Sequence, residues 1–211
     1  MSFQEYPVVK LTFLGTGTSQ GVPVVACNCK VCSSKDTRDK RLRSSVLLEI
    51  NNINIVIDAG PDFRYQMLRE KVTQLHAVLL THGHKDHAGG LDDVRAYNYF
   101  MQKPMDVYAS NSVNRQIKKE YAYAFSDNKY PGVPDINLHN IKNKIFSIHG
   151  ITILPIKVIH YNTPIFGYRF GKLVYITDAK YIEDKEKEKL KNAKILIVNA
   201  VRHKQHYSHF N

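Results

Sequence analysis

Thr81-His82-Gly83-His84-Lys85-Asp86-His87 is the stretch that decides how the chain is interpreted. It closes the short, almost continuous apolar run 75–81, which predicts a buried strand. Its ligand-type side chains are ordered His-x-His-x-Asp-His. Residues two apart in extended backbone point the same way, so His82 and His84 can reach one ion together. Asp86 and His87 are adjacent and would diverge toward a second ion if the chain turns after Lys85.

The alternative interpretation of this stretch is a polar loop that happens to be rich in histidine. Its place at the end of a buried strand, where catalytic sites commonly lie, favours a metal centre instead. Gly89-Gly90 gives the backbone freedom for a loop before the next helix. Imidazole and carboxylate ligands together suit zinc, manganese or iron(II).

Further ligand-type residues follow predicted strands downstream. His160 comes after the strand 151–158, and Asp178 comes after the strand 173–176. A lone histidine is more often a surface or core residue, so it is the shared position after strands that makes these residues candidates. A carboxylate at a strand end can also bridge two metals. The strand 194–199, predicted to be buried, is followed by three more candidates, His203, His206 and His209.

Composition indicates an ordinary globular chain. Its 211 residues are 43% hydrophobic and 23% charged, which fits a single domain spanning 1–211. No apolar run approaches the roughly 20 residues that cross a bilayer. The first ten residues, MSFQEYPVVK, lack the apolar centre of a signal peptide. We therefore expect a cytoplasmic protein without a membrane partner.

The formal net charge is +11, which favours anionic partners such as nucleotides, nucleic acid or acidic lipid. The alternative interpretation is a generally solvated basic surface, and composition alone does not decide between the two. The basic residues are spread along the chain, with a loose cluster at 35–43. This spread favours a small anionic substrate over a dedicated nucleic-acid arm. Three cysteines, Cys27, Cys29 and Cys32, lie within six positions. An odd number so close together is a poor disulfide framework and a better start for a metal site.

The order of predicted elements indicates an α/β fold of two mixed sheets sandwiched by helices. Asn51-Asn52 is a hairpin signal between two strands, and Asp62 is placed to cap the helix that follows. The region 126–135 holds two prolines and a glycine and is predicted to be a loop. The predicted strands are 8–14, 45–50, 53–58, 75–81, 145–148, 151–158, 165–170, 173–176 and 194–199. The predicted helices are 63–68, 91–100, 113–124 and a charged surface helix at 183–192.

The motifs together resemble the metallo-β-lactamase superfamily, whose signature is His-x-His-x-Asp-His. Ile57-Asp58-Ala59-Gly60 resembles the acidic motif of that superfamily which supports the metal loop. Leu14-Gly15-Thr16-Gly17-Thr18-Ser19-Gln20-Gly21-Val22-Pro23, followed by Cys-x-Cys-x-x-Cys, resembles a narrower group, the PhnP-like phosphodiesterases, which are relatives of RNase Z. Phe166-Gly167-Tyr168 and Thr177-Asp178 are similar to this group as well.

The resemblance implies an αβ/βα sandwich that binds two divalent ions, manganese or zinc. His82, His84 and His160 would hold one ion, and Asp178 would bridge to the other. The second ion would be held by Asp86, His87 and His209, of which Asp86 and His209 are also the expected catalytic residues. The group opens cyclic phosphates of ribose, so the implied substrate is a small phosphodiester.

The resemblance also implies a structural zinc on Cys27, Cys29 and Cys32, with a histidine from near the C-terminus as the fourth ligand. No matching histidine is found, although His203 or His206 could substitute. The family continues past its last ligand with a helix and a strand, which we expect this chain to lack because it stops at Asn211.

Three classes of function stay open: the PhnP-like phosphodiesterase, an RNase Z-like endonuclease acting on tRNA, and a non-catalytic, metal-stabilised protein that binds nucleotides or nucleic acid. Thioester or lactam hydrolysis is also compatible with the superfamily. The sequence does not set the oligomeric state, and a homodimer is compatible with it.

Overall fold

The computed structural model describes residue 6 and residues 9–211. It divides into two compact units. We call residues 10–140 the N-terminal unit, and residues 141–211, with the described residues before Lys10, the C-terminal unit. Each unit contains one sheet, and each is described by itself. The single domain expected from the length stays a prediction.

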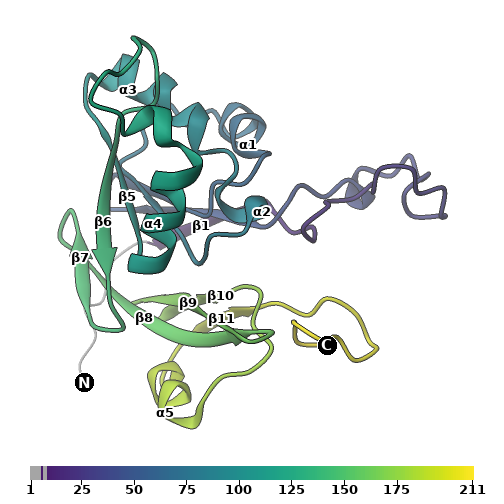
Figure 1. Ribbon diagram of the computed structural model, residues 1–211. Helices are drawn as coiled ribbons and strands as arrows, with labels where there is room; N and C mark the ends of the chain where they lie inside the picture. Colours follow the sequence, from purple (N-terminus) through teal and green to yellow (C-terminus); the bar gives the residue numbers. More distant parts are fainter. Residues whose placement is uncertain (1–5, 7–8) are drawn as a thin grey trace. The chain divides into compact units, whose positions relative to one another are not determined.

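The N-terminal unit contains a six-stranded sheet in the order β1-β2-β3-β4-β5-β6 (Figure 1). Strands β2 and β3 pair antiparallel, whereas β3, β4 and β5 run parallel, so the sheet is mixed. The strands are β1 (Val9–Gly15), β2 (Ser45–Ile50), β3 (Ile53–Ile57), β4 (Ala77–Leu79), β5 (Met105–Ser110) and β6 (Ile136–Ile141).

The β2–β3 hairpin confirms the turn predicted from the sequence. Asn51 and Asn52 both adopt positive φ, 50° and 63°. Asparagine tolerates this left-handed conformation, and two such residues give the turn whose twist matches that of the paired strands. The turn sets the register that pairs Val46 with Ile57, and so places the end of β3 just before Asp58.

Helices of the N-terminal unit pack with the sheet around one apolar core. Leu14, Val56 and Val107 from the strands meet Phe63 and Ile117 from the helices in this core. The helices are α1 (Phe63–Arg69), α2 (Lys85–Ala88), α3 (Arg95–Met101) and α4 (Asn111–Glu120), with 3-10 turns η1 (Thr37–Asp39), η2 (Leu91–Val94) and η3 (Ala122–Ala124). The apolar spacing thus predicted these helical regions, but the start of the predicted helix 91–100 and the end of the predicted helix 113–124 are 3-10 turns.

The long connection between β1 and β2 extends away from the rest of the N-terminal unit (Figure 1). Its base is closed by bridges from Gly17 to Arg43 and from Val22 to Arg41. Gly15 is required there, because a Cβ would lie 2.0 Å from the Arg43 carbonyl oxygen. Arg43 in turn pairs with Asp62 at 2.9 Å. Asp62 occupies the cap position of α1 as predicted, but its carboxylate binds Arg43 and makes no capping bond to the helix.

The C-terminal unit contains a five-stranded sheet in the order β11-β10-β9-β8-β7. Strands β10 and β11 pair in parallel, whereas β9–β10, β8–β9 and β7–β8 pair antiparallel, so this sheet is mixed too. The strands are β7 (Phe146–Ile148), β8 (Ile151–His160), β9 (Thr163–Phe170), β10 (Leu173–Ile176) and β11 (Ile195–Val198). Ile156, Val158 and Val174 form its core with Ile182, and Leu190 packs against them.

The predicted surface helix 183–192 is a short helix, α5 (Asp184–Lys187), followed by the 3-10 turn η4 (Glu188–Leu190). It is not wholly a surface element, because Glu186 is buried. The Glu186 carboxylate accepts bonds from Lys189 Nζ at 2.7 Å, Asn143 Nδ2 at 2.7 Å and the Lys157 backbone N–H at 2.9 Å. These three donors offset the free-energy cost of burying the Glu186 carboxylate charge.

The sequence analysis missed two strands and was wrong about the burial of a third. Strands β5 and β6 were not predicted. Strand β11 was predicted to be buried, but it lies at the end of its sheet, with Ile195, Leu196 and Val198 44–55% exposed. None of the helices in the described part of the chain has the length and apolar character that a bilayer span requires.

Candidate metal centre

The His82 to His87 stretch forms a compact cluster at the end of β4. His84 has extended backbone, and α2 begins immediately after it at Lys85, one residue earlier than the expected turn. His82 and His87 are buried, whereas His84 is exposed. His82 Nε2 lies 3.0 Å from His84 Nδ1, and His87 Nε2 lies 3.2 Å from Asp86 Oδ2. The ligand atoms of His82 and His84 therefore lie together, as the spacing predicted, and those of Asp86 and His87 also lie close to each other.

Asp58 fixes which ring nitrogens of the cluster are available. Its fully buried carboxylate accepts a bond from His87 Nδ1 at 2.7 Å, which leaves Nε2 as the ligand atom of His87. The Thr81 hydroxyl donates to Asp58 Oδ2 at 2.9 Å and so accepts from His82 Nδ1, also at 2.9 Å. His82 is thereby left with Nε2 as its ligand atom. Such carboxylate–histidine pairs orient the ligands of metal sites.

Asp58 is buried and held in place by its neighbours, and both conditions affect the pKa of its carboxyl. Burial raises the pKa of the Asp58 carboxyl, and His87 and the two Thr81 donors oppose that rise. Asp58 also has a positive φ of 65°, a conformation that aspartate tolerates better than most residues. The Thr81 backbone N–H donates to Asp58 Oδ1 at 2.8 Å, so the carboxylate is held from both the backbone and the side chain of its neighbour.

The distances in this cluster fit a bound ion. Two nitrogens on a tetrahedral zinc, with bonds of about 2.0–2.1 Å, lie about 3.3 Å apart. The separation of 3.0 Å between His82 Nε2 and His84 Nδ1 is close to that value. Imidazoles with a fixed tautomer and an adjacent carboxylate form the donor set that divalent zinc or manganese takes.

A second cluster lies in the C-terminal unit. The ligand atoms of His160, Asp178 and His209 all lie within 4.8 Å of one another. His160 is the last residue of β8, and its Nδ1 donates to the Ser208 carbonyl oxygen at 3.0 Å, which leaves Nε2 as its ligand atom. His209 Nδ1 is 3.7 Å from Asp178 Oδ1. The backbone N–H of Phe210 donates to the Ala179 carbonyl at 2.7 Å and holds the segment that carries His209.

The other two downstream candidates differ from each other. The ring of His206 lies 4.8 Å from that of His209, between centroids, so it borders the second cluster. His206 is also held by Lys180, whose Nζ donates to its carbonyl at 2.5 Å. His203 is exposed and belongs to none of the clusters of metal-ligand type in the described residues.

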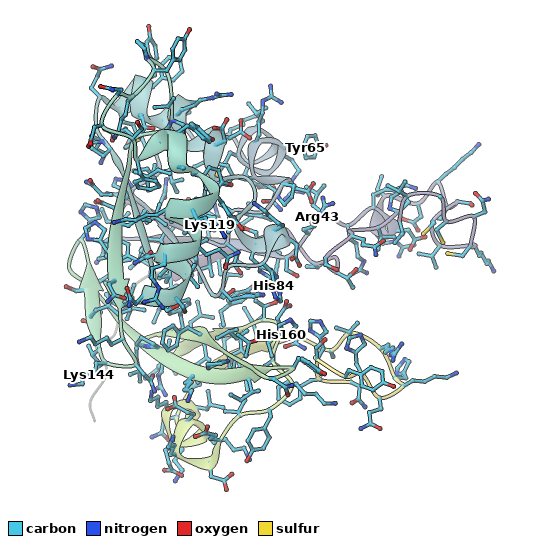
Figure 2. All side chains as sticks on the ribbon, viewed as in Figure 1. Arg43, Tyr65, His84, Lys119, Lys144 and His160 are labelled. Atoms are coloured by element: carbon cyan, nitrogen blue, oxygen red, sulfur yellow. The ribbon has the colours of Figure 1, made fainter. Side chains whose placement is uncertain are left out.

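The three cysteines form a third cluster, in the loop between β1 and β2. Their sulfur atoms lie within 4.8 Å of one another, at the far end of that loop (Figure 2). The Cys32 backbone N–H donates to Cys29 Sγ at 3.5 Å and, with bonds from Cys27 and Cys32 side chains, lowers the pKa of Cys29 to about 7. A thiol with this pKa is readily converted to the thiolate that binds metal. Within residue 6 and residues 9–211, no fourth histidine, cysteine or carboxylate joins the three.

Sequence reasoning missed two residues that support the first cluster. Thr81 stood at the start of the motif without a role, although its hydroxyl links Asp58 to His82. Gln116 on α4 donates to the Gly83 carbonyl oxygen at 2.6 Å. The only sequence signal for it is its spacing of four residues from Glu120, which puts both side chains on one face of a helix.

Residues 53–211 match the Beta-lactamase superfamily domain. The chain belongs to the β-lactamase superfamily. The match includes both histidine clusters and Asp58, but not the three cysteines. The expected fold class, two mixed sheets with helices on them, is confirmed by the strand order and by this match.

One solved structure from the PhnP family is similar to nearly the whole chain. The crystal structure of a protein described as a new diphosphatase from the PhnP family is 39% identical, with a TM-score of 0.88, and the alignment covers 96% of this chain and 77% of that one. Zn²⁺-bound PqqB from Methylobacterium extorquens is 20% identical with a TM-score of 0.72, over 91% of this chain and 73% of that one, and shows the fold alone. A protein of Porphyromonas gingivalis (strain ATCC BAA-308 / W83) named octanoyltransferase is 41% identical over 204 residues, which is 95% of this chain. The chain spans only 41% of the length of that relative.

Proposed function

We propose that this chain is a binuclear metal-dependent hydrolase that cleaves a phosphodiester in a small anionic substrate. The observation that carries the proposal is the set of ordered imidazoles in the two histidine clusters. In His82, His87 and His160, one ring nitrogen is bound to a protein oxygen, which directs the opposite nitrogen toward neighbouring side chains of metal-ligand type. A histidine-rich polar loop would not require this arrangement in both units.

The roles proposed for single residues follow the resemblance to the PhnP-like group. One ion would be held by His82, His84 and His160. The other would be held by Asp86, His87 and His209, with Asp178 bridging the two. When bound, two such ions activate water and neutralise charge on the phosphoryl oxygens of an in-line displacement.

The residues of the chain itself would supply orientation and proton handling. Asp58 holds His87 with its Nδ1 protonated, so that this ring cannot turn its proton toward the substrate. Asp86 and His209 are the residues that we propose take part in the reaction itself. His206, beside His209, is the second candidate for giving a proton to the leaving oxygen. The net charge of +11 favours the approach of an anion.

A diphosphate is the second candidate substrate, because the relative with 39% identity is described as a diphosphatase. In both reactions water attacks phosphorus and a P–O bond breaks, so the same residues would serve. The relative named octanoyltransferase does not decide between them, since the chain matches two fifths of its length.

The experiment is a hydrolysis assay with Mn²⁺ on bis(p-nitrophenyl) phosphate, a cyclic ribose phosphate and a diphosphate ester. Asp178→Ala should lose activity by a factor of about a hundred or more, whereas His203→Ala, an exposed histidine outside the clusters, should retain it. No turnover of any substrate by the wild type would reject the hydrolase. Cleavage of a precursor tRNA with steep salt dependence would favour the RNase Z-like alternative.

A further inference from the structure

The stretch that carries His82 to His87 is held by the C-terminal end of α4. Three side chains of that helix end, Gln116, Glu120 and Tyr121, bind it at three points, and we call these three residues the brace. Glu120 is the last residue of α4, and Tyr121 is its cap. All contacts of the brace lie within the N-terminal unit.

The first contact is between the two histidines of the His-x-His pair. Gln116 Nε2 donates to the Gly83 carbonyl oxygen at 2.6 Å. A Cβ on Gly83 would lie 2.2 Å from Gln116 Oε1, so the amide packs directly on the Gly83 backbone. The side chain therefore fixes the one residue that separates His82 from His84.

The second and third contacts lie further along the stretch. Gln116 Nε2 also donates to Glu120 Oε1 at 2.9 Å, and Glu120 Oε2 accepts from Lys85 Nζ at 2.8 Å. Lys85 directly precedes Asp86. The buried Tyr121 hydroxyl donates to the Ala88 carbonyl at 2.9 Å, directly after His87.

We propose that the brace is a positioning device that presets the metal-binding stretch and thereby raises its affinity for divalent ions. This inference rests on the metal binding of the proposed function. The brace residues supply no ligand themselves. They hold the stretch at two points between the four ligand side chains and at one point directly after them, so that little order has to be gained when an ion binds. Partners of this kind typically alter metal affinity by about 10–100-fold.

The test measures Mn²⁺ binding by electron paramagnetic resonance, in which the signal of the free ion reports the bound fraction. Mn²⁺ is the probe because it prefers carboxylate and imidazole to the thiols of the cysteine cluster. Gln116→Met removes the amide and keeps the length of the side chain. Lys119→Met is the control, since Lys119 is exposed on the same helix (Figure 2) and its side chain makes no hydrogen bond or ion pair within the described part of the chain.

Gln116→Met should weaken Mn²⁺ binding by at least about tenfold, with faster dissociation into a chelator. The melting temperature of the metal-free protein should stay within about 2 °C of wild type, because a surface hydrogen bond contributes little to global stability. In a double-mutant cycle with Glu120→Gln, the double variant should lose less Mn²⁺ binding free energy than the two single variants lose together, because both residues act through one chain of hydrogen bonds.

Mn²⁺ affinity of Gln116→Met within about twofold of wild type would overturn the brace, as would an equal loss in Lys119→Met. A fall in affinity matched by a fall in metal-free melting temperature would also overturn it, because the role would then be structural. If the wild type bound no Mn²⁺ at all, the proposed function itself would fail, and the brace with it.

Discussion

Replacing Asp58 by asparagine should weaken metal binding without weakening the fold. Asparagine has the same shape as aspartate and also tolerates the positive φ of 65° found at this position. The amide oxygen can still accept a bond from the Thr81 backbone, which donates to Oδ1 at 2.8 Å. The amide nitrogen, however, would face His87 Nδ1, which now donates to Oδ2 at 2.7 Å.

Two donors cannot share a hydrogen bond, so His87 would have to carry its proton on Nε2 instead. That nitrogen is the proposed ligand atom, and protonation removes it from the ion. We expect Mn²⁺ affinity to fall about 10–100-fold. This range corresponds to about 1.4–2.8 kcal/mol of binding free energy.

The metal-free protein should be as stable as wild type or more so, because a fully buried carboxylate is replaced by a neutral amide. Isothermal titration with Mn²⁺ measures the first effect, and calorimetric melting of the metal-free protein measures the second. Gln74→Glu, on an exposed loop residue, is a control for an acid–amide exchange of the opposite sign. An unchanged Mn²⁺ affinity in Asp58→Asn would refute the reasoning, since the tautomer of His87 would then be set elsewhere.

Two other perturbations test separate parts of the chain. Glu186→Gln should lower the free energy of unfolding by about 2 kcal/mol at pH 7. Burial alone would raise the pKa of Glu186, but Lys189, Lys157 and Asn143 hold it below its ordinary value of 4.5. The stabilisation by the Glu186 carboxylate is therefore complete above pH 4.5 and is lost as the pH falls through the lower folded pKa. Free energies of unfolding from urea titrations of wild type and variant should converge in acid. A difference that stays constant with pH would contradict the assignment. Cys29→Ser should remove zinc from the cysteine cluster and leave Mn²⁺ binding at the histidines unchanged; metal analysis showing the same zinc content in both proteins would place that zinc elsewhere.

The sequence predicted the elements whose residues carry a strong local signal. Asn51 and Asn52 have the turn chemistry of a hairpin, and the hairpin is present. Strand β5 was missed because its buried face is formed by Met105, Val107 and Ala109, of which two favour helices more than strands. Strand β6 was missed because only its first and last residues are buried, and its centre has a single apolar residue, Leu138, among polar ones.

The candidate site was predictable where spacing along the chain determines geometry. His82 and His84 are two apart in extended backbone, and their nitrogens meet. The contact between Gln116 and Gly83 joins residues 33 positions apart, and nothing in the local pattern of α4 indicates what its end will touch. The role of Thr81 likewise depends on Asp58, 23 positions earlier, being brought beside it by the parallel pairing of β3 and β4.

Strand β11 affects how this chain should be handled in solution. The outer edge of an open sheet presents a row of backbone groups to which any extended chain can add, and apolar side chains on both faces strengthen such an attachment. Ile195, Leu196 and Val198 are of this kind. Concentrated samples should therefore aggregate and become turbid. The number of metal ions per chain is best determined in dilute solution, where aggregated protein does not trap metal.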